Sequence, residues 1–146
     1  MSATYDTFGT SNSFDTFMIK VYVTKQSNYP VSSPKIKKSL REFFAKNGIV
    51  SDAEVSVAIV GEAKMKKLAH DHLRESNNVH NVLSFVEEDT KINFQYPSRD
   101  VIPLGEIVVC YPKVVEEAKN ENKIIETKLI ELLEHGAEHL MGMHHT

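Results

Sequence analysis

The chain has 146 residues, a length at which a single domain buries roughly 68–70% of its unfolded surface. It carries 17 Lys and Arg against 20 Asp and Glu, and the resulting net charge of −3 argues against non-specific binding to nucleic acid. The single cysteine, Cys110, rules out an internal disulfide and fits a reducing compartment such as the cytoplasm, while the longest apolar run, residues 107–111, is too short for a membrane helix.

The amino-terminal segment differs in composition from the rest of the chain. Residues 1–15 are polar, which is compatible with a disordered tail. The segment contains Asp6 and Asp15, and no basic residue precedes Lys20, so it resembles neither a secretory signal nor a transit peptide. We expect residues 16–146 to form one domain, because no repeat or flexible linker interrupts them.

Hydrophobic periodicity predicts eight elements, of which the first four alternate between strand and helix. Residues 17–24 alternate between apolar and polar, as a half-buried strand does. A helix is predicted to open at Ser33-Pro34 and to end at Gly48. A second strand is predicted at residues 53–60, and a second helix at residues 62–73.

The second half of the chain is predicted to hold two strands followed by two helices. A short strand at residues 81–86 and a polar loop at 87–99 precede an apolar strand at 104–110, in which we expect Cys110 to be a buried structural thiol. The two helices are predicted at residues 111–120 and 125–141. The expected buried stripe of the last helix is Ile125, Leu129, Leu132, Leu133 and Leu140. This order predicts an α/β (α+β) fold with a mixed four-stranded sheet packed with helices.

Three histidines near the carboxyl end form the pattern with the most chemical content. His135 and His139 are spaced i,i+4, so on a helix both rings can bind one divalent ion. Gly142 can end the helix in a left-handed conformation, and the next three residues are long enough to fold His145 back onto that ion. Three neutral imidazoles suit zinc, and three protein ligands instead of four leave a position open for water.

Two alternatives stand beside this interpretation. An i,i+4 histidine pair on a surface helix is often only solvated, and it is the third histidine after a helix-ending glycine that favours a metal. His144 also competes with its neighbour for the third position, although the register favours His145. We therefore predict one Zn²⁺ ion, or another divalent metal, bound by His135, His139 and His145.

The same residues resemble a known family. Residues 135–145 are similar to the H-G-x-x-H-L-x-G-x-x-H signature of the YbeY family, although His144 replaces the usual Asp and Glu138 the usual Leu. Two upstream segments agree with the family in order and spacing, and the whole resemblance covers about residues 17–145. These segments are Leu73-Arg74 followed by Asn81-Val82-Leu83-Ser84-Phe85, and Leu104-Gly105-Glu106-Ile107-Val108-Val109-Cys110.

The resemblance implies a metal-dependent endoribonuclease, a hydrolase that cuts single-stranded RNA with a metal-activated water in ribosomal RNA maturation and ribosome quality control. It implies ribosomal RNA and the small ribosomal subunit or its associated proteins as partners, with neither DNA nor a membrane. It also implies a zincin-like metal helix beside the sheet, which would make residues 16–146 a metallohydrolase domain. The catalytic residues that it implies are His135 and Arg74, which takes the place of the family's active-site arginine.

The chemistry of single residues bears on these expectations. A guanidinium is the best fixed counter-charge for a phosphodiester, which suits Arg74, although a surface salt bridge at a helix end is its ordinary role. The H-E-x-x-H metalloproteases have their general base where this chain has Gly136, which argues against a protease. Glu138, at i+3 from His135, can reach the metal face, but the more ordinary interpretation is a solvated residue, and His80 is expected to be a turn residue more than a substrate contact.

Two further classes of function remain open from the sequence. The chain can be a metallohydrolase of another substrate, such as a peptide, or a ribosome-assembly binding factor whose metal site is only structural. The charge is also uneven, since basic residues outnumber acidic ones by 11 to 8 in residues 1–80 but are outnumbered by 12 to 6 in residues 81–146. The basic runs at residues 35–41 and 64–67 can attract phosphate, but the more ordinary interpretation is that they are the solvated faces of two helices.

Overall fold

The computed structural model describes residues 17–86 and 101–142. This part of the chain contains eight elements in the predicted order, with bounds close to those expected. The strands are β1 (Ile19–Lys25), β2 (Ala53–Val60), β3 (Val82–Val86) and β4 (Ile102–Cys110), and the helices are α1 (Ser33–Lys46), α2 (Glu62–Leu73), α4 (Tyr111–Asn120) and α5 (Ile125–Leu140). The predicted tail at 1–15 and the predicted loop at 87–99 lie outside the described residues.

The four strands form one mixed sheet in the order β1-β2-β4-β3. β1, β2 and β4 run parallel, whereas β3 lies antiparallel to β4. The predicted fold class and the mixed four-stranded sheet are therefore confirmed. β1 and β3 form the two edges of this four-stranded sheet.

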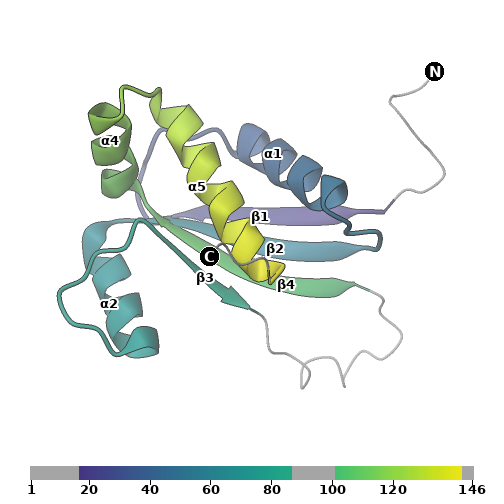
Figure 1. The fold of residues 1–146 in the computed structure, drawn as a ribbon, viewed down its shortest axis with the longest axis horizontal. Helices are drawn as coiled ribbons and strands as arrows, with labels where there is room; N and C mark the ends of the chain where they lie inside the picture. The colour runs from purple at the N-terminus through teal and green to yellow at the C-terminus, as the bar shows by residue number, and fades with distance from the viewer. Residues whose placement is uncertain (1–16, 87–100, 143–146) are drawn as a thin grey trace.

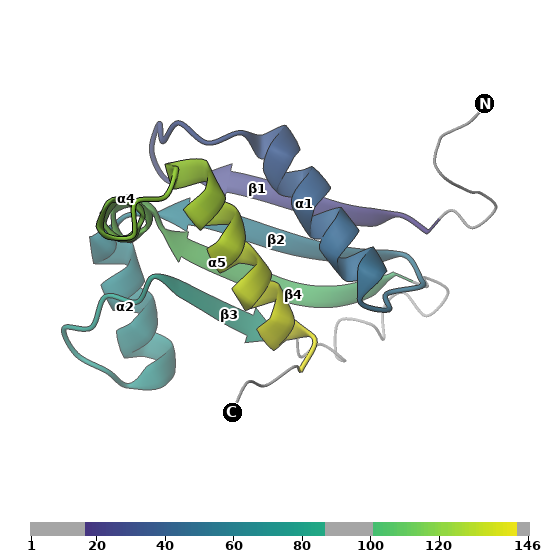
Figure 2. The same cartoon turned by 45° about the horizontal axis from the view of Figure 1, so that its top comes forward.

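Helices cover both faces of the sheet. α1 and α5 lie over one face and α2 lies against the other (Figures 1 and 2). In β4, Ile107 and Val109 pack into the core beneath α1 and α5. Val108 and Cys110 face the opposite way, into a smaller core with Met65 of α2. A strand that is buried on both faces has a continuous apolar sequence, which explains the apolar run at residues 107–110.

The burial of β4 confirms the expected structural role of Cys110. Its thiol is free, fully buried, and shielded from solvent by the small core against α2. Burial raises the pKa of the Cys110 thiol above its usual range, which makes the reactive thiolate scarcer. In addition, none of the helices in the described ranges is long and apolar enough to cross a membrane.

The expected buried stripe of α5 is correct except at its first residue. Leu129, Leu132, Leu133 and Leu140 are buried, but Ile125 is 38% exposed. Ile125 is the first residue of α5 and lies at the rim of a surface hollow, where the neighbouring elements do not cover it completely. The stripe predicted from the helical period therefore begins one turn before the observed one, which starts at Leu129.

A buried lysine that the sequence pattern did not predict joins α5 to α4. Lys128 is only 6% exposed, and its ammonium donates hydrogen bonds of 3.0 and 3.1 Å to the carboxylate oxygens of Glu121. Glu131 and Glu117 lie 3.6 and 3.7 Å from the same nitrogen. Burial alone lowers the pKa of Lys128, but the hydrogen bonds and charges of these carboxylates outweigh it and raise the pKa. Three acidic side chains thus keep a buried amine charged.

This cluster predicts acid sensitivity of the α4–α5 packing. Hydrogen bonds from Lys128 lower the pKa of Glu121, and a hydrogen bond from Lys123 lowers that of Glu131. The stability that these carboxylates contribute is therefore present above their ordinary pKa of 4.5 and is lost as the pH falls through the lowered values of the folded state. We expect the melting temperature of Lys128→Met to fall less between pH 7 and pH 4 than that of the wild type. Equal falls would contradict a role of the cluster in acid unfolding.

Candidate metal centre

The last turns of α5 bring the two predicted metal-binding histidines together. The rings of His135 and His139 have centroids 4.8 Å apart with an angle of 85° between their planes, and both residues are exposed. Two imidazoles that ligate one ion at about 2.0–2.1 Å have ring centroids roughly 5 Å apart. The separation of the two rings is therefore compatible with a shared divalent ion.

The third predicted ligand remains a prediction. His145 and its neighbour His144 lie outside the described residues. Within residues 17–86 and 101–142, no group of three or more side chains of the metal-binding types is gathered in one place. The described structure therefore brings together two of the three predicted ligands. They lie at the end of the helix from which the chain continues toward His145.

Glu138 lies beside the pair, although it was expected to be a solvated residue. Its carboxylate is 3.7 Å from Nδ1 of His135, and its side chain is only 24% exposed. In metal sites, a carboxylate that faces one ring nitrogen of a histidine orients the other nitrogen toward the ion. Glu138 occupies that position relative to His135, and its side chain is part-buried instead of fully solvated.

An acidic hollow of about 420 Å³ adjoins His135. Its lining consists of Asn81, Glu131, Leu132, Glu134, His135 and Glu138. Burial raises the pKa of Glu134, and the nearby charge of Glu138 raises it further, while Lys46 of α1 acts in the opposite sense. The negative charge of these side chains favours a cation near His135.

Gly136 explains how closely α5 approaches the sheet. A Cβ atom at this position would lie 2.7 Å from Cγ2 of Ile107 and 2.9 Å from Oγ of Ser84, so only glycine fits without a shift. The hydroxyl of Ser84 donates a 2.9 Å hydrogen bond to the carbonyl oxygen of Gly136. The segment at 81–85 and the histidine segment, which are far apart in sequence, therefore meet at this contact. A glutamate general base of the metalloprotease kind has no room here.

Arg74 lies at the end of α2, on the other face of the sheet from the histidine pair. It is exposed and has a φ of 58°, in the left-handed region. Its N–H donates to the carbonyl oxygen of His70, which is the bond of an αL helix cap, with arginine in the usual place of glycine, and the N–H of Glu75 donates to the carbonyl oxygen of Ala69. Arg74 is in no ion pair with any carboxylate of the described chain, so the ordinary salt-bridge role is not seen.

The structure does not bring Arg74 into contact with the histidines. α5 packs on β3 from one face, through Ser84, and α2 borders the same edge strand from the other face, through Phe85. The ring of His72, two residues before Arg74, lies 4.8 Å from that of Phe85 in a groove that also contains Ser84. The sequence analysis did not single out His72, although this histidine directly precedes the Leu73-Arg74 segment.

His80 has the turn role that was expected. Its Nε2 is 2.6 Å from the carboxylate of Glu75, within the connection between α2 and β3. That hydrogen bond lowers the pKa of Glu75, and a second bond from Asn78 acts in the same sense. The pair holds the connection after Arg74 in a fixed shape, so the backbone that presents Arg74 is supported on both sides.

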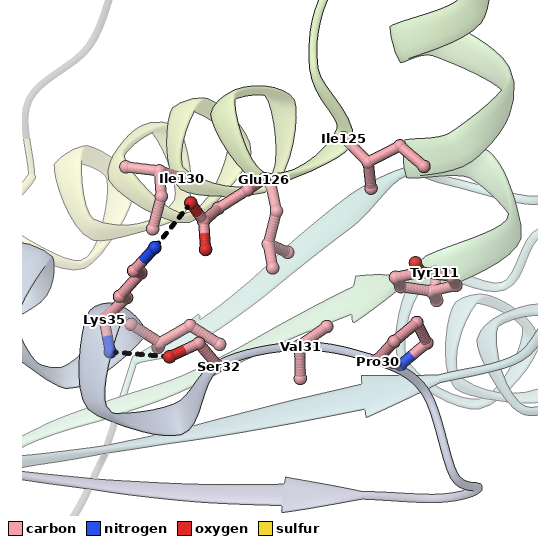
Figure 3. Close-up of a pocket in the computed structure, with 10 residues that line it drawn as sticks. Pro30, Val31, Ser32, Lys35, Tyr111, Ile125, Glu126 and Ile130 are labelled. Carbon is pink, nitrogen blue, oxygen red and sulfur yellow. Dashed lines mark hydrogen bonds and ion pairs between the residues drawn. The ribbon is translucent and has the colours of Figure 1, made fainter.

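A second hollow, of about 190 Å³, lies at the opposite end of α5 and is mostly apolar (Figure 3). The side chains of Pro30, Val31, Tyr111 and Ile125 line it, and an ion pair of 3.3 Å between Lys35 and Glu126 closes one side. No histidine or cysteine is among its lining residues. Its chemistry therefore does not suit a metal, and the candidate centre is the histidine pair.

Comparisons with known proteins agree with this arrangement. Residues 22–146 match the family model described as Endoribonuclease YbeY. An Endoribonuclease YbeY of Acinetobacter baumannii is 32% identical over 111 residues, which cover 76% of this chain and 68% of the relative. That of Nitrosospira multiformis is 32% identical over 130 residues, covering 86% of this chain and 68% of the relative.

A solved structure gives the same result for the fold. The solution structure of TM1509 from Thermotoga maritima superimposes with a TM-score of 0.54 at 27% sequence identity, covering 86% of this chain and 75% of that one. The fold and the histidine helix define an α/β protein with a candidate metal centre at the edge of a mixed sheet. The sequence matches place it further, and the chain belongs to the YbeY family of endoribonucleases.

The Gly136 contact predicts an unusual response to alanine. Alanine favours a helix over glycine by about 1 kcal/mol, but overpacking of a tight contact typically costs about 1–3 kcal/mol. We expect Gly136→Ala to lower the free energy of unfolding by up to about 2 kcal/mol, measured by urea denaturation. The change should be smaller in the presence of Ser84→Ala, which removes one of the two atoms in the way. Strictly additive effects of the two substitutions would contradict the contact.

Proposed function

We propose that this protein cleaves single-stranded ribosomal RNA during rRNA maturation and ribosome quality control, as a metal-dependent endoribonuclease. The observation that carries the proposal is the histidine pair on α5, with ring centroids 4.8 Å apart, held against the sheet by Gly136 in a member of an endoribonuclease family. Such an enzyme meets its substrate in the cytoplasm, where we place it together with the small ribosomal subunit and its associated proteins. Neither DNA nor a membrane is required.

His135, His139 and His145 are the residues that would hold the ion, for which zinc is the best match to neutral imidazoles. When bound with an open coordination position, such an ion lowers the pKa of a water to about 7 and so supplies a nucleophile at neutral pH. Glu138 orients the ring of His135, and the acidic hollow beside it favours the approach of a cation.

Arg74 acts on the substrate in this proposal. A guanidinium cannot ligate a cation, but it can donate two parallel hydrogen bonds to a phosphate and balance the charge that develops there. Arg74 is exposed and free of ion pairs with the described carboxylates, so its donors are available. Arg74 and the histidines approach the edge strand β3 from opposite faces. In this proposal both contact the bound substrate, although they do not contact each other.

The metal site predicts a measurable loss on removal of its ligands. We expect wild-type protein to bind about one equivalent of Zn²⁺ and the double variant His135→Ala, His139→Ala to bind almost none, measured by elemental analysis after dialysis. His70→Ala removes an exposed histidine of α2 and serves as the matched control, with full metal content. Full metal content in the double variant would place the site elsewhere.

Cleavage of a labelled single-stranded RNA in the same preparations tests the activity. The wild type and His70→Ala should cut it, and both a chelator and the double histidine variant should abolish cutting. Metal binding without any cleavage would support the binding-factor alternative. His145→Ala and His144→Ala then assign the third ligand, because metal loss in the His144 variant alone would show that His144, and not His145, completes the site.

Arg74 predicts a loss of activity without a loss of structure. Arg74→Lys keeps the charge but not the two-pronged donor, and Arg74→Gly suits the positive φ of the position. We expect both variants to retain metal and to unfold within about 1 kcal/mol of the wild type, because the relief of backbone strain offsets the added freedom of the unfolded chain. Their kcat/KM on RNA should fall by about a hundredfold or more. Unchanged kinetics in Arg74→Lys would remove the arginine from the mechanism.

A further inference from the structure

A basic groove of about 510 Å³ runs along the outer edge of the sheet, at the strand farthest from β3. It is lined by residues 17–22, which include most of β1, and by Lys37 and Arg41 of α1. β1 pairs with β2 along one side only, so the groove follows an edge strand with α1 above it. This surface takes no part in the candidate metal centre.

The cations of the groove are not paired with any carboxylate in the part of the chain that the structure describes. Lys37 and Arg41 are spaced i,i+4, so they project from the same side of α1. Neither they nor Lys20 forms an ion pair with a carboxylate in the described ranges, and the groove lining contains no acidic residue. Acidic residues beside the groove include Glu54, the cross-strand neighbour of Lys20, and Asp52, whose carboxylate accepts a 2.8 Å hydrogen bond from the backbone N–H of Met18.

Several other lysines of the described chain form ion pairs. Lys35 pairs with Glu126 at 3.3 Å, Lys67 pairs with Asp71 at 3.0 Å, and Lys128 is held by three carboxylates. Those lysines serve the fold. Lys37 and Arg41 serve no ion pair of the described fold, which leaves their charge available to an external anion.

Exposed aromatic rings accompany these cations. Tyr22 is 49% exposed and Phe17 is 51% exposed, and both line the groove. Tyr22 and Lys20 alternate along β1 with Ile19 and Val21, which are buried beneath α1, so these two side chains flank the edge strand on the face away from Lys37 and Arg41. Proteins that bind single-stranded nucleic acid combine a cationic groove along the phosphates with aromatic rings on which bases stack. The groove contains both components, in a chain whose overall charge does not favour non-specific binding.

We propose that the groove of residues 17–22, Lys37 and Arg41 binds single-stranded RNA as a second contact region, separate from the histidine pair. The proposal rests on the proposed function, because it assigns to the same substrate a second place on the protein. α1 and α5 both end toward the end of the sheet where β1 begins (Figure 2). Different parts of one RNA strand can therefore reach the groove and the histidine pair from the same end of the molecule.

Two plainer interpretations explain less. Lysines on an edge strand protect it from pairing with other chains, which accounts for Lys20 but not for the two cations on the helix. An added strand of protein would use the unpaired backbone of β1 and would need no cluster of unpaired cations. Charge complementarity therefore favours a polyanion over a peptide in this groove.

The test is a salt titration of binding to a single-stranded RNA of about 16 nucleotides with 2′-O-methyl groups, which resists cleavage while the metal-loaded protein is intact. Fluorescence anisotropy compares the wild type with Lys37→Ala, Arg41→Ala and with a control pair, Lys64→Ala, Lys66→Ala. Both pairs remove two exposed or partly exposed helical cations that are in no ion pair within the described chain. Circular dichroism confirms that each variant is folded.

We expect the groove pair to weaken binding about tenfold at low salt and to reduce the slope of log affinity against log salt by about 1.4, since each phosphate contact of a single strand contributes about 0.7. The control pair should change neither. Tyr22→Leu should weaken binding by about tenfold at all salt concentrations, and Tyr22→Phe, which keeps the ring, should not. These measurements require no cleavage, so they test RNA binding by the groove even if the protein shows no nuclease activity.

Equal effects of the groove pair and the control pair would overturn the proposal, as would an unchanged salt slope in the groove pair or the absence of binding by the wild type. An unchanged slope would leave the edge of β1 as a place for an added protein strand. Conversely, normal groove behaviour together with absent cleavage would separate RNA binding from the proposed chemistry.

Discussion

The arrangement of the site depends on one close contact, the packing of Gly136 in α5 against Ser84 and Ile107 in the sheet. With no side chain at this position, the helix backbone approaches β3 closely enough to accept a 2.9 Å hydrogen bond from the Ser84 hydroxyl. His135 directly precedes the contact and His139 follows one turn later, so their height and rotation over the edge strand are fixed by it. The rigidity of the candidate centre is thus a property of backbone packing, which the surrounding core reinforces.

The two helices that cover the same face of the sheet differ in charge. α1 carries five basic residues and one acidic residue, whereas α5 carries four glutamates and one lysine, and that lysine is buried among carboxylates. The net charge of the chain conceals this division. The surface of α1 therefore attracts anions and that of α5 attracts cations, a separation that suits the proposed function, in which a metal ion and a polyanionic substrate would be held at the same time.

The sequence predicted the order of the elements and the fold class, because β4 and α5 have strong and different hydrophobic periods. It also predicted that His135 and His139 lie together, since that follows from helical spacing alone. It did not predict that Lys128 is buried or that Ile125 is exposed, because both depend on what α4 and α1 cover. The orienting place of Glu138 and the steric need for Gly136 likewise depend on distances between elements far apart in the chain, which periodicity does not contain.

The position of the histidine pair along its helix has an electrostatic consequence. His139 lies in the last turn of α5, which ends at Leu140, and the peptide dipoles of a helix leave a partial negative charge at this end. Backbone N–H groups of Met141 and Gly142 offset part of that charge through bonds to the final carbonyls. What remains favours a cation over a neutral molecule or an anion, typically by about 0.3–1 kcal/mol. The same two histidines placed in the first turn of a helix would have to hold an ion against the field of their own backbone.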